Sequence, residues 1–254
     1  MRKRRPQLIV GTGLVVCLFG LRLAPAQDRA MASAPAFGGG VFVTPVAGAP
    51  FSAVAVQEMR EPLRDGSLFQ RKTEALITRD SAGRISNERH EVVPANSTRI
   101  PALLSVHLYD PETQLSTFLN PFTHVARQQA LSRAPATTPP GNWAQQPKTS
   151  PGKNVRLEDL GSAALDGIDV HGYRRTITLG GESTGTGKPV AVVDEYWYSE
   201  ELRINLLSKH SDPRTGELTI TVTNLNRTEP DPSLFEIPQG YKVVDLTPEP
   251  AGAQ

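Results

Sequence analysis

Alternation of apolar and polar residues recurs along much of this chain and predicts β-strands. In the stretch 218–223, Leu218, Ile220 and Val222 alternate with three threonines, the pattern of a strand with one buried and one exposed face. Comparable β-compatible runs span residues 67–80, 84–93, 103–109, 114–119, 173–179, 189–198 and 202–210. We therefore predict a mainly β fold: a single curved antiparallel sheet, or half-barrel, with one or two short helices.

Turn-forming residues separate these runs. Asp80–Gly83, Asp110–Thr113 and Asp212–Glu217 each combine aspartate with proline, serine or glycine, which favours tight turns between antiparallel strands. Asp231 followed by Pro232 is typical of a helix start and predicts one short helical turn at 231–235. Residues 122–132 are the only stretch compatible with a longer helix. The expected architecture is a long meander that must close into a barrel or cover its open face.

The first residues have the three parts of a secretory signal peptide. Basic residues at 2–5 precede a largely apolar run at 8–23, and Ala24-Pro25-Ala26 offers a cleavage site. We expect export to the periplasm or the medium after cleavage near Ala26. Removing residues 1–26 leaves 22 basic and 26 acidic residues, a formal charge of −4. That charge lacks the basic footprint of a nucleic-acid-binding protein.

Composition divides the remaining chain. Residues 27–50 are rich in alanine, glycine and proline and predict a flexible leader. Residues 51–247 form the expected single domain, with a proline-rich loop at 134–152 and a disordered tail at 248–254. The only cysteine, Cys17, lies in the signal peptide, so disulfides and thiolate chemistry are not expected in the mature chain.

Candidate catalytic and metal motifs lack the context that they require. Ser183 lies in a Gly-x-Ser-x-Gly pattern, but the glycines and proline after it resist the helix that a nucleophile elbow needs. The five histidines show no metal-binding spacing. Glu88 and His90 would share one strand face, as would Ser105 and His107, and polar pairing explains both without a metal. We expect neither a cofactor nor catalysis.

The second half of the chain resembles the periplasmic lipoprotein-carrier superfamily. The resemblance is carried by the strand–turn–strand around residues 212–216 and by the closing segment DPSLFEIPQGYKVVD at 231–245, and it extends over about residues 51–247. It implies an incomplete antiparallel barrel whose hollow, in the lipoprotein carrier, holds acyl chains. These motifs are turn and packing signatures, so they bear on fold more than on activity.

Three functional hypotheses follow. The first is an exported, monomeric, non-enzymatic protein that binds an acyl chain or a lipid-modified partner such as a lipoprotein. The second is a protein–protein interaction module of the cell envelope, which would use strand edges or the 134–152 loop. The third is a serine hydrolase acting through Ser183. The residues expected to line an apolar groove, which could equally form an ordinary core, are Val106, Leu108, Trp197, Ile204, Leu206, Leu218, Ile220 and Val222.

Overall fold

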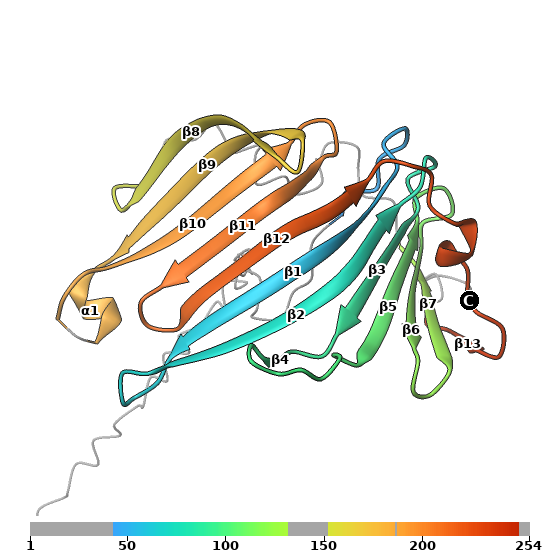
Figure 1. Ribbon diagram of the computed structural model, residues 1–254, viewed down its shortest axis with the longest axis horizontal. Coiled ribbons are helices and arrows are strands. Elements are labelled where there is room, and N and C mark those ends of the chain that lie inside the picture. The colour runs from blue at the N-terminus through green and yellow to red at the C-terminus, as the bar shows by residue number, and fades with distance from the viewer. Residues whose placement is uncertain (1–42, 132–151, 186, 249–254) are drawn as a thin grey trace, which may run out of the picture. The chain divides into compact units, whose positions relative to one another are not determined.

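A computed structural model describes residues 43–131, 152–185 and 187–248. Within this part of the chain the fold is a single open sheet built from two antiparallel meanders (Figure 1). The predicted signal peptide, most of the predicted leader, all but the last residue of the 134–152 loop and most of the tail lie outside the described residues. None of the helices in the described ranges is long and apolar enough to span a membrane.

The first meander occupies residues 51–130. Its strands are β1 (Phe51–Pro62), β2 (Leu68–Arg79), β3 (Ile85–His90), β5 (Leu103–Asp110), β6 (Leu115–Asn120) and β7 (Val125–Ala130). The two-residue strand β4 (Val93–Pro94) pairs with β2 beside the main order. The mainly β prediction is confirmed, and the predicted turn at Asp80–Gly83 joins β2 to β3.

The second meander occupies residues 155–226. It comprises β8 (Val155–Leu165), β9 (Ile168–Leu179), β10 (Val190–Ser199), β11 (Ile204–Asp212) and β12 (Gly216–Asn226). β12 pairs with β1, which joins the two meanders into one sheet, and β13 (Lys242–Asp245) adds a parallel strand beside β7. Gly216 is required at this seam, because its φ is +111° and a Cβ there would collide with the carbonyl of Arg60.

Alternation explains how β1 forms the centre of the sheet. Phe51, Ala53, Ala55, Gln57 and Met59 are all buried, whereas the residues between them are partly or fully exposed. The first three belong to the main hydrophobic core, which also draws on β2, β3, β9, β11 and β12. Burial of one face of β1 against both meanders therefore fixes the register of the seam.

Arg79 is a charged side chain inside this core. It is 0% exposed, and its guanidinium donates to the carbonyls of Ala49, Thr44 and Leu202 at 2.7–2.9 Å. It also stacks over the ring of Phe51, 4.9 Å from the centroid. Burial lowers the pKa of Arg79 to about 10. Because Thr44 and Ala49 belong to the predicted leader, this cation holds residues 44–49 against the core.

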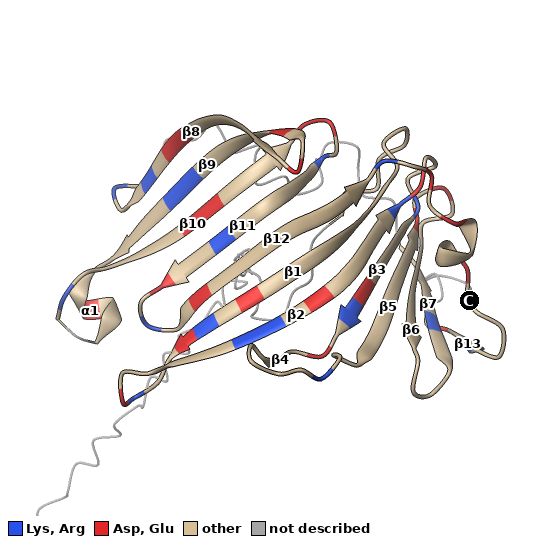
Figure 2. Cartoon of the chain, in the orientation of Figure 1, with Lys and Arg blue, Asp and Glu red and all other residues tan. Residues whose placement is uncertain are grey.

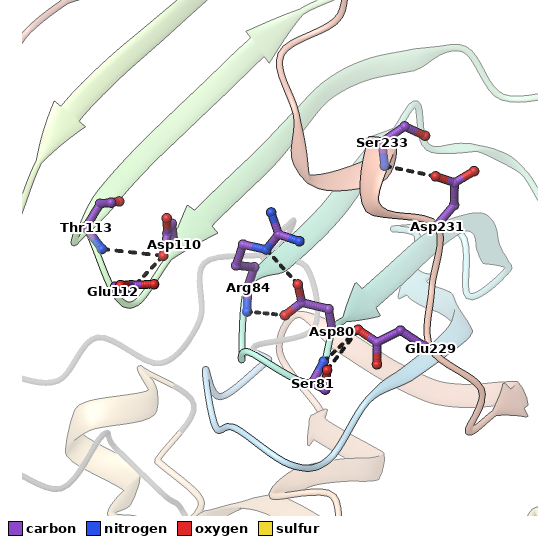
Figure 3. A network of polar contacts seen from close by, with 9 residues as sticks. All are labelled: Asp80, Ser81, Arg84, Asp110, Glu112, Thr113, Glu229, Asp231 and Ser233. Atoms are coloured by element: carbon purple, nitrogen blue, oxygen red, sulfur yellow. Dashed lines mark hydrogen bonds and ion pairs between the residues drawn. The ribbon is translucent and has the colours of Figure 1, made fainter.

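Aspartate side chains close the turns of the first meander (Figure 3). Asp80 accepts from the backbone N–H of Arg84 at 2.7 Å and from its Nε at 2.6 Å. Asp110 accepts from the backbone N–H groups of Glu112 and Thr113, at 2.8 and 3.4 Å. These local bonds stabilise tight turns independently of the strands that they connect.

The C-terminal segment also follows its sequence signals (Figure 3). Asp231 accepts from the backbone N–H of Ser233 at 2.9 Å and caps the 3-10 helix η1 (Pro232–Phe235). Beyond it, Ile237 and Tyr241 pack on a second cluster formed by Leu108, Leu119 and Ala126. The predicted short helical turn is confirmed, and the segment after it covers one face of β5–β7.

The possible longer helix at residues 122–132 is wrong. Asn120 accepts from the backbone N–H groups of Phe122 and Thr123, both at 3.0 Å, and His124 has a φ of +51°. The turn therefore reverses the chain, and Val125–Ala130 form β7 between β6 and β13. Strand partners on both sides override the weak helical preference of this stretch.

Candidate ligand groove

A groove of about 550 Å³ lies against the strands of the first meander. Its volume falls within the range of small-molecule sites in proteins, about 300–1,000 Å³. Its lining is mixed, with aliphatic and aromatic side chains at most positions and a smaller polar set. The lining residues are Val43, Pro45, Ala75, Ile77, Ile85, Asn87, Glu88, Arg89, Ser105, His107, Tyr109, Phe118 and Leu131.

Strand pairing places most of these side chains on one face of the sheet. Three successive cross-strand pairs join β3 to β5, namely Ile85 with Tyr109, Asn87 with His107, and Arg89 with Ser105. Side chains directly opposite each other in an antiparallel ladder share a face, so these six residues define what we call the groove face. Along it the pairs change from apolar to polar.

The groove lies beside an interruption in the ladder. β2 pairs with β3 at residues 77–79 and with β4 at residues 71–72, so residues 73–76 have no strand partner on that side. The carboxylate of Glu88 lies near this gap, where it accepts from the backbone N–H of Leu76 at 3.4 Å and contacts His90 Nε2 at 2.8 Å. The predicted pairing of Glu88 with His90 is therefore observed.

Three buried side-chain atoms near this interruption, Arg71 Nε and the two oxygens described next, have no hydrogen-bond partner within the described ranges. The side-chain oxygens Asn87 Oδ1 and Thr73 Oγ1 are both buried, and no donor or acceptor within the structure's described ranges satisfies them. Thr73 lies on the same face of β2 as Ala75, which lines the groove, and is 5% exposed. Buried polar atoms without partners are uncommon in folded proteins, and each one calls for an explanation such as a bound water or ligand.

His107 forms part of the groove wall. Its ring stacks on Phe118, with centroids 4.4 Å apart and planes 15° apart, and its Nε2 lies 2.9 Å from Ser116 Oγ. Burial lowers the pKa of His107, so the neutral ring is favoured. No carboxylate in the described part of the chain is hydrogen-bonded to this ring, so the histidine–serine contact lacks the orienting group of a catalytic triad.

In the second meander, charged residues on neighbouring strands form ion pairs (Figure 2). Basic residues on β9 and β11, drawn in blue, lie on either side of acidic residues on β10, drawn in red. Asp194, 4% exposed, accepts from Arg175 Nη2 at 2.7 Å and contacts His210 Nδ1 at 2.7 Å. Nearby, burial raises the pKa of Tyr196 to about 12. The charges in this region are matched within the chain.

The eight predicted groove residues lie outside this groove lining. Val106 and Leu108 are on the opposite face of β5, against the C-terminal segment. Ile204, Leu206 and Val222 are buried in the main core, and Trp197 packs against that core with its ring over Gly172. Leu218 and Ile220 pair with Met59 and Gln57 across the seam. Their contact with a ligand stays a prediction.

The sequence alone indicates one pair of residues from the observed groove, Ser105 and His107, together with Glu88 at its edge. Most of the other lining residues, among them Ile77, Ile85 and Tyr109, lie in predicted strands. The exceptions are Val43 and Pro45, in the predicted leader, and Leu131, in the stretch predicted as a possible helix. What was missing was the pairing of β2, β3 and β5, which decides the side chains that face each other. The alternation within residues 85–89 is the one local signal that could have indicated a polar end beside Ile85.

Ser183 lies in a strand–turn–strand setting. The four-residue helix α1 (Gly181–Thr184) follows β9, and Gly185 ends it with a φ of +69° before the chain continues to β10. Ser183 is exposed, and within the described ranges no histidine contacts it. The predicted absence of a long helix after the serine is confirmed. Across those same ranges, no group of three or more histidine, cysteine or acidic residues is arranged to hold a metal ion.

A third polar cluster lies on β8 and β9. His171 contacts Asp159 Oδ1 at 2.7 Å through Nε2 and Ser162 Oγ at 3.3 Å through Nδ1. The three residue types are those of a hydrolytic triad, but the Asp159 side chain is 66% exposed and the groove described above lies on other strands. The cluster is an exposed cross-strand polar contact on a part of the sheet distant in strand order from the groove.

No protein-family model matches the chain, and no curated protein matches it in sequence. Among solved structures, the chain is similar to an uncharacterized conserved protein from Thermus thermophilus, with 12% identity, a TM-score of 0.40, and coverage of 78% of this chain and 90% of that one. It is also similar to MucB in the Pseudomonas aeruginosa MucA/MucB complex, with 12% identity and a TM-score of 0.36. That match covers 78% of this chain and 58% of the other.

A third similar structure is a LolA superfamily protein from Nitrosomonas europaea. It is 10% identical, with a TM-score of 0.30 and coverage of 74% of this chain and 90% of that one. The similar structures thus include a member of the lipoprotein-carrier superfamily that the sequence resembles.

Proposed function

We propose that this protein is an exported, non-enzymatic binding protein whose groove holds an acyl chain or the acyl group of a lipid-modified partner. The observation that carries the proposal is the groove itself, about 550 Å³ in volume with mostly aliphatic and aromatic walls. An apolar chain gains free energy by leaving water for such a surface, at about 25 cal/mol for each Å² buried.

The apolar part of the groove is well suited to a flexible hydrocarbon. Val43 and Ile77 are 3% and 1% exposed, so the core itself fixes their positions, while Phe118 remains 52% exposed. A rigid floor with an exposed aromatic side chain at the rim allows a chain to enter without unfolding the sheet. Groove walls without directed polar groups at this end favour methylene chains over hydrogen-bonding ligands.

Uptake of a fluorescent fatty acid by the purified mature protein tests this function. Wild-type protein should increase the probe's fluorescence and protect it from water, and native mass spectrometry after gentle purification from the original host should show a co-purified lipid. Ala75→Trp places a large ring in the groove and should abolish uptake. Ala191→Trp, at an exposed position of β10, is the matched control. Absence of both uptake and co-purified lipid from wild-type protein would disprove the proposal.

One observation favours a second function, interaction with another protein of the cell envelope. β8 is an 11-residue strand whose one partner among the described strands is β9, so its other edge offers backbone groups to an added strand. Pull-downs with wild-type protein, with Leu157→Lys on β8, and with residues 134–152 deleted would separate the edge from the loop. Recovery of the same partners by all three proteins would count against both surfaces.

A further inference from the structure

The groove has a direction set by the register of β3 and β5. The pair Ile85–Tyr109 marks its apolar end, the pair Asn87–His107 follows, and Arg89–Ser105 marks its polar end. Successive residues on one strand face are separated by about 7 Å, twice the rise per residue. The two polar pairs therefore occupy a length comparable to a small head group, directly beyond the apolar part.

Asn87 supplies an unused acceptor at this end. Its Oδ1 is buried and has no hydrogen-bond partner within the residues that the structure covers. A buried carbonyl oxygen without a donor is costly, and a ligand hydroxyl or amide N–H removes that cost on binding. The ring of His107 beside it is engaged with Ser116 and Phe118. Asn87 as a whole is half-buried and lines the groove, so a change of its side-chain rotamer brings Oδ1 to a ligand.

Arg89 supplies an unused cation. Its side chain is exposed at the groove, and no acidic residue of the described ranges forms an ion pair with it. The nearest acidic residue in sequence, Glu88, is held by the N–H of Leu76 and by His90. An arginine presents a planar fork of donors that suits carboxylate and phosphate oxygens. Ser105, opposite Arg89, offers a hydroxyl to the same anion.

We infer that the groove selects amphiphiles whose head group combines an anionic oxygen with a hydrogen-bond donor. The hydrocarbon chain lies at the Ile85–Tyr109 end, the donor of the head bonds Asn87 Oδ1, and the anion contacts Arg89. This inference rests on the proposed function, because it assigns the polar end of the same groove. A phosphate with a neighbouring hydroxyl and a carboxylate with a neighbouring amide both satisfy this chemistry.

Displacement of the fluorescent fatty acid by four palmitoyl competitors tests the inference. Palmitoyl lysophosphatidate and N-palmitoylglycine carry both an anion and a donor, palmitate carries the anion alone, and monopalmitin carries hydroxyls alone. The first two should compete about tenfold more strongly than the last two. Monopalmitin lacks the charge-assisted bond to Arg89, palmitate lacks the donor that satisfies the buried oxygen of Asn87, and each loss corresponds to about that factor. Lysophosphatidate exceeding palmitoylglycine would identify phosphate as the preferred anion, and the reverse would identify carboxylate.

Two substitutions separate the contribution of the anion contact from that of the donor contact. Arg89→Gln should weaken the three anionic competitors about tenfold and leave monopalmitin unchanged. Asn87→Leu should weaken lysophosphatidate, palmitoylglycine and monopalmitin, and leave palmitate unchanged. The matched controls are Arg64→Gln, an exposed arginine between β1 and β2, and Asn205→Leu, which removes another unpartnered buried oxygen on β11. Neither control substitution should change how strongly any of the four competitors displaces the fluorescent fatty acid.

The outcomes separate the inference from the function on which it rests. Equal competition by all four amphiphiles would overturn head-group selection and leave acyl binding standing. An equal effect of Arg64→Gln and Arg89→Gln would also overturn it, since general charge attraction would then explain the preference. Failure of wild-type protein to take up the probe would remove the acyl-binding function itself.

Discussion

Two polar sites, one on each meander, differ in whether their buried side chains have partners. On β9–β11, Asp194 lies between Arg175 and His210, and the buried charge has partners within the chain. On β2 and β3, Thr73 Oγ1 and Asn87 Oδ1 are buried without partners. A fully satisfied polar network stabilises a single arrangement, whereas unsatisfied groups lower stability unless something else binds them. The site at Thr73 and Asn87 therefore carries a free-energy cost that a bound ligand removes, and the site at Asp194 does not.

Arg79 joins the two meanders, and its loss should have the largest effect. Arg79→Leu would leave the carbonyls of Thr44, Ala49 and Leu202 without their donor inside the core. We expect the free energy of unfolding to fall by about 3–5 kcal/mol, because each buried carbonyl left without a donor costs about 1–3 kcal/mol. The free energy of unfolding is measured by urea denaturation, with tryptophan fluorescence as the signal. Arg227→Leu breaks an exposed ion pair with Glu201 and should cost less than about 1 kcal/mol; equal losses would contradict the assigned role.

Asp194→Ala tests the satisfied network of the second meander. Removing the carboxylate leaves Arg175 and His210 facing each other without their shared acceptor, so we expect a loss of about 2–3 kcal/mol. The same denaturation experiment applies. Asp159→Ala, at a 66% exposed carboxylate, is the control and should lose much less. Uptake of the fluorescent fatty acid should be unchanged by Asp194→Ala at temperatures where the variant is folded.

A pair of threonines on β2 compares a satisfied and an unsatisfied hydroxyl on the same strand. Thr78 Oγ1 donates to the carbonyl of Ser86 at 3.1 Å, whereas Thr73 Oγ1 has no partner among the described residues, and both residues are at most 5% exposed. Thr78→Val should destabilise the protein by about 1 kcal/mol, and Thr73→Val should stabilise it by a similar amount. Thermal melts of the ligand-free variants decide this; a loss in both would mean that Thr73 has a partner.

The smallest expected effect is a pH dependence from His107. Its pKa is lowered by burial from the ordinary value of 6.5, so the unfolded chain binds a proton more readily than the folded chain. The contribution of His107 to stability is therefore complete above pH 6.5 and declines as the pH falls through the lowered pKa. Denaturation midpoints should drop over that interval, and His107→Gln should flatten the drop. An unchanged slope would assign the pH dependence to other groups.

Local sequence signals predicted most elements of the fold. Alternation and β-compatible runs identified β2, β3, β5, β6 and β9–β12, but gave no bounds for β1, β4, β8 or β13. The pattern of β8 is irregular, and its register shifts between Asp159 and Gly161. Aspartate and proline marked the turns and the start of η1, because their side chains bond backbone groups within a few residues or fix the backbone. The possible helix at 122–132 was wrong because contacts with β6 and with the distant β13 determine that segment.

The candidate site was much less accessible from sequence. Val106 and Leu108 were chosen for their apolar character, yet they face Ile237 and Tyr241 on the far side of β5. Their strand neighbours His107 and Tyr109 line the groove instead. Alternation along β5 distinguishes the two faces of the strand but does not indicate which face another segment covers. The segment that covers Val106 and Leu108 comes from residues more than 100 positions later in the sequence.

The sequence by itself determined a β-sheet protein with aspartate-closed turns, a short capped helical turn and no coherent catalytic motif, because each of these depends on residues close together in the chain. The tertiary structure alone decided how β2, β3 and β5 pair and which face the C-terminal segment covers. Within the described ranges, the tertiary structure also leaves Asn87 Oδ1 without a hydrogen-bond partner, beside the part of β2 that has no strand partner on the side of β3. Pairing between distant strands fixes these features, and alternation within one strand does not encode the register between two.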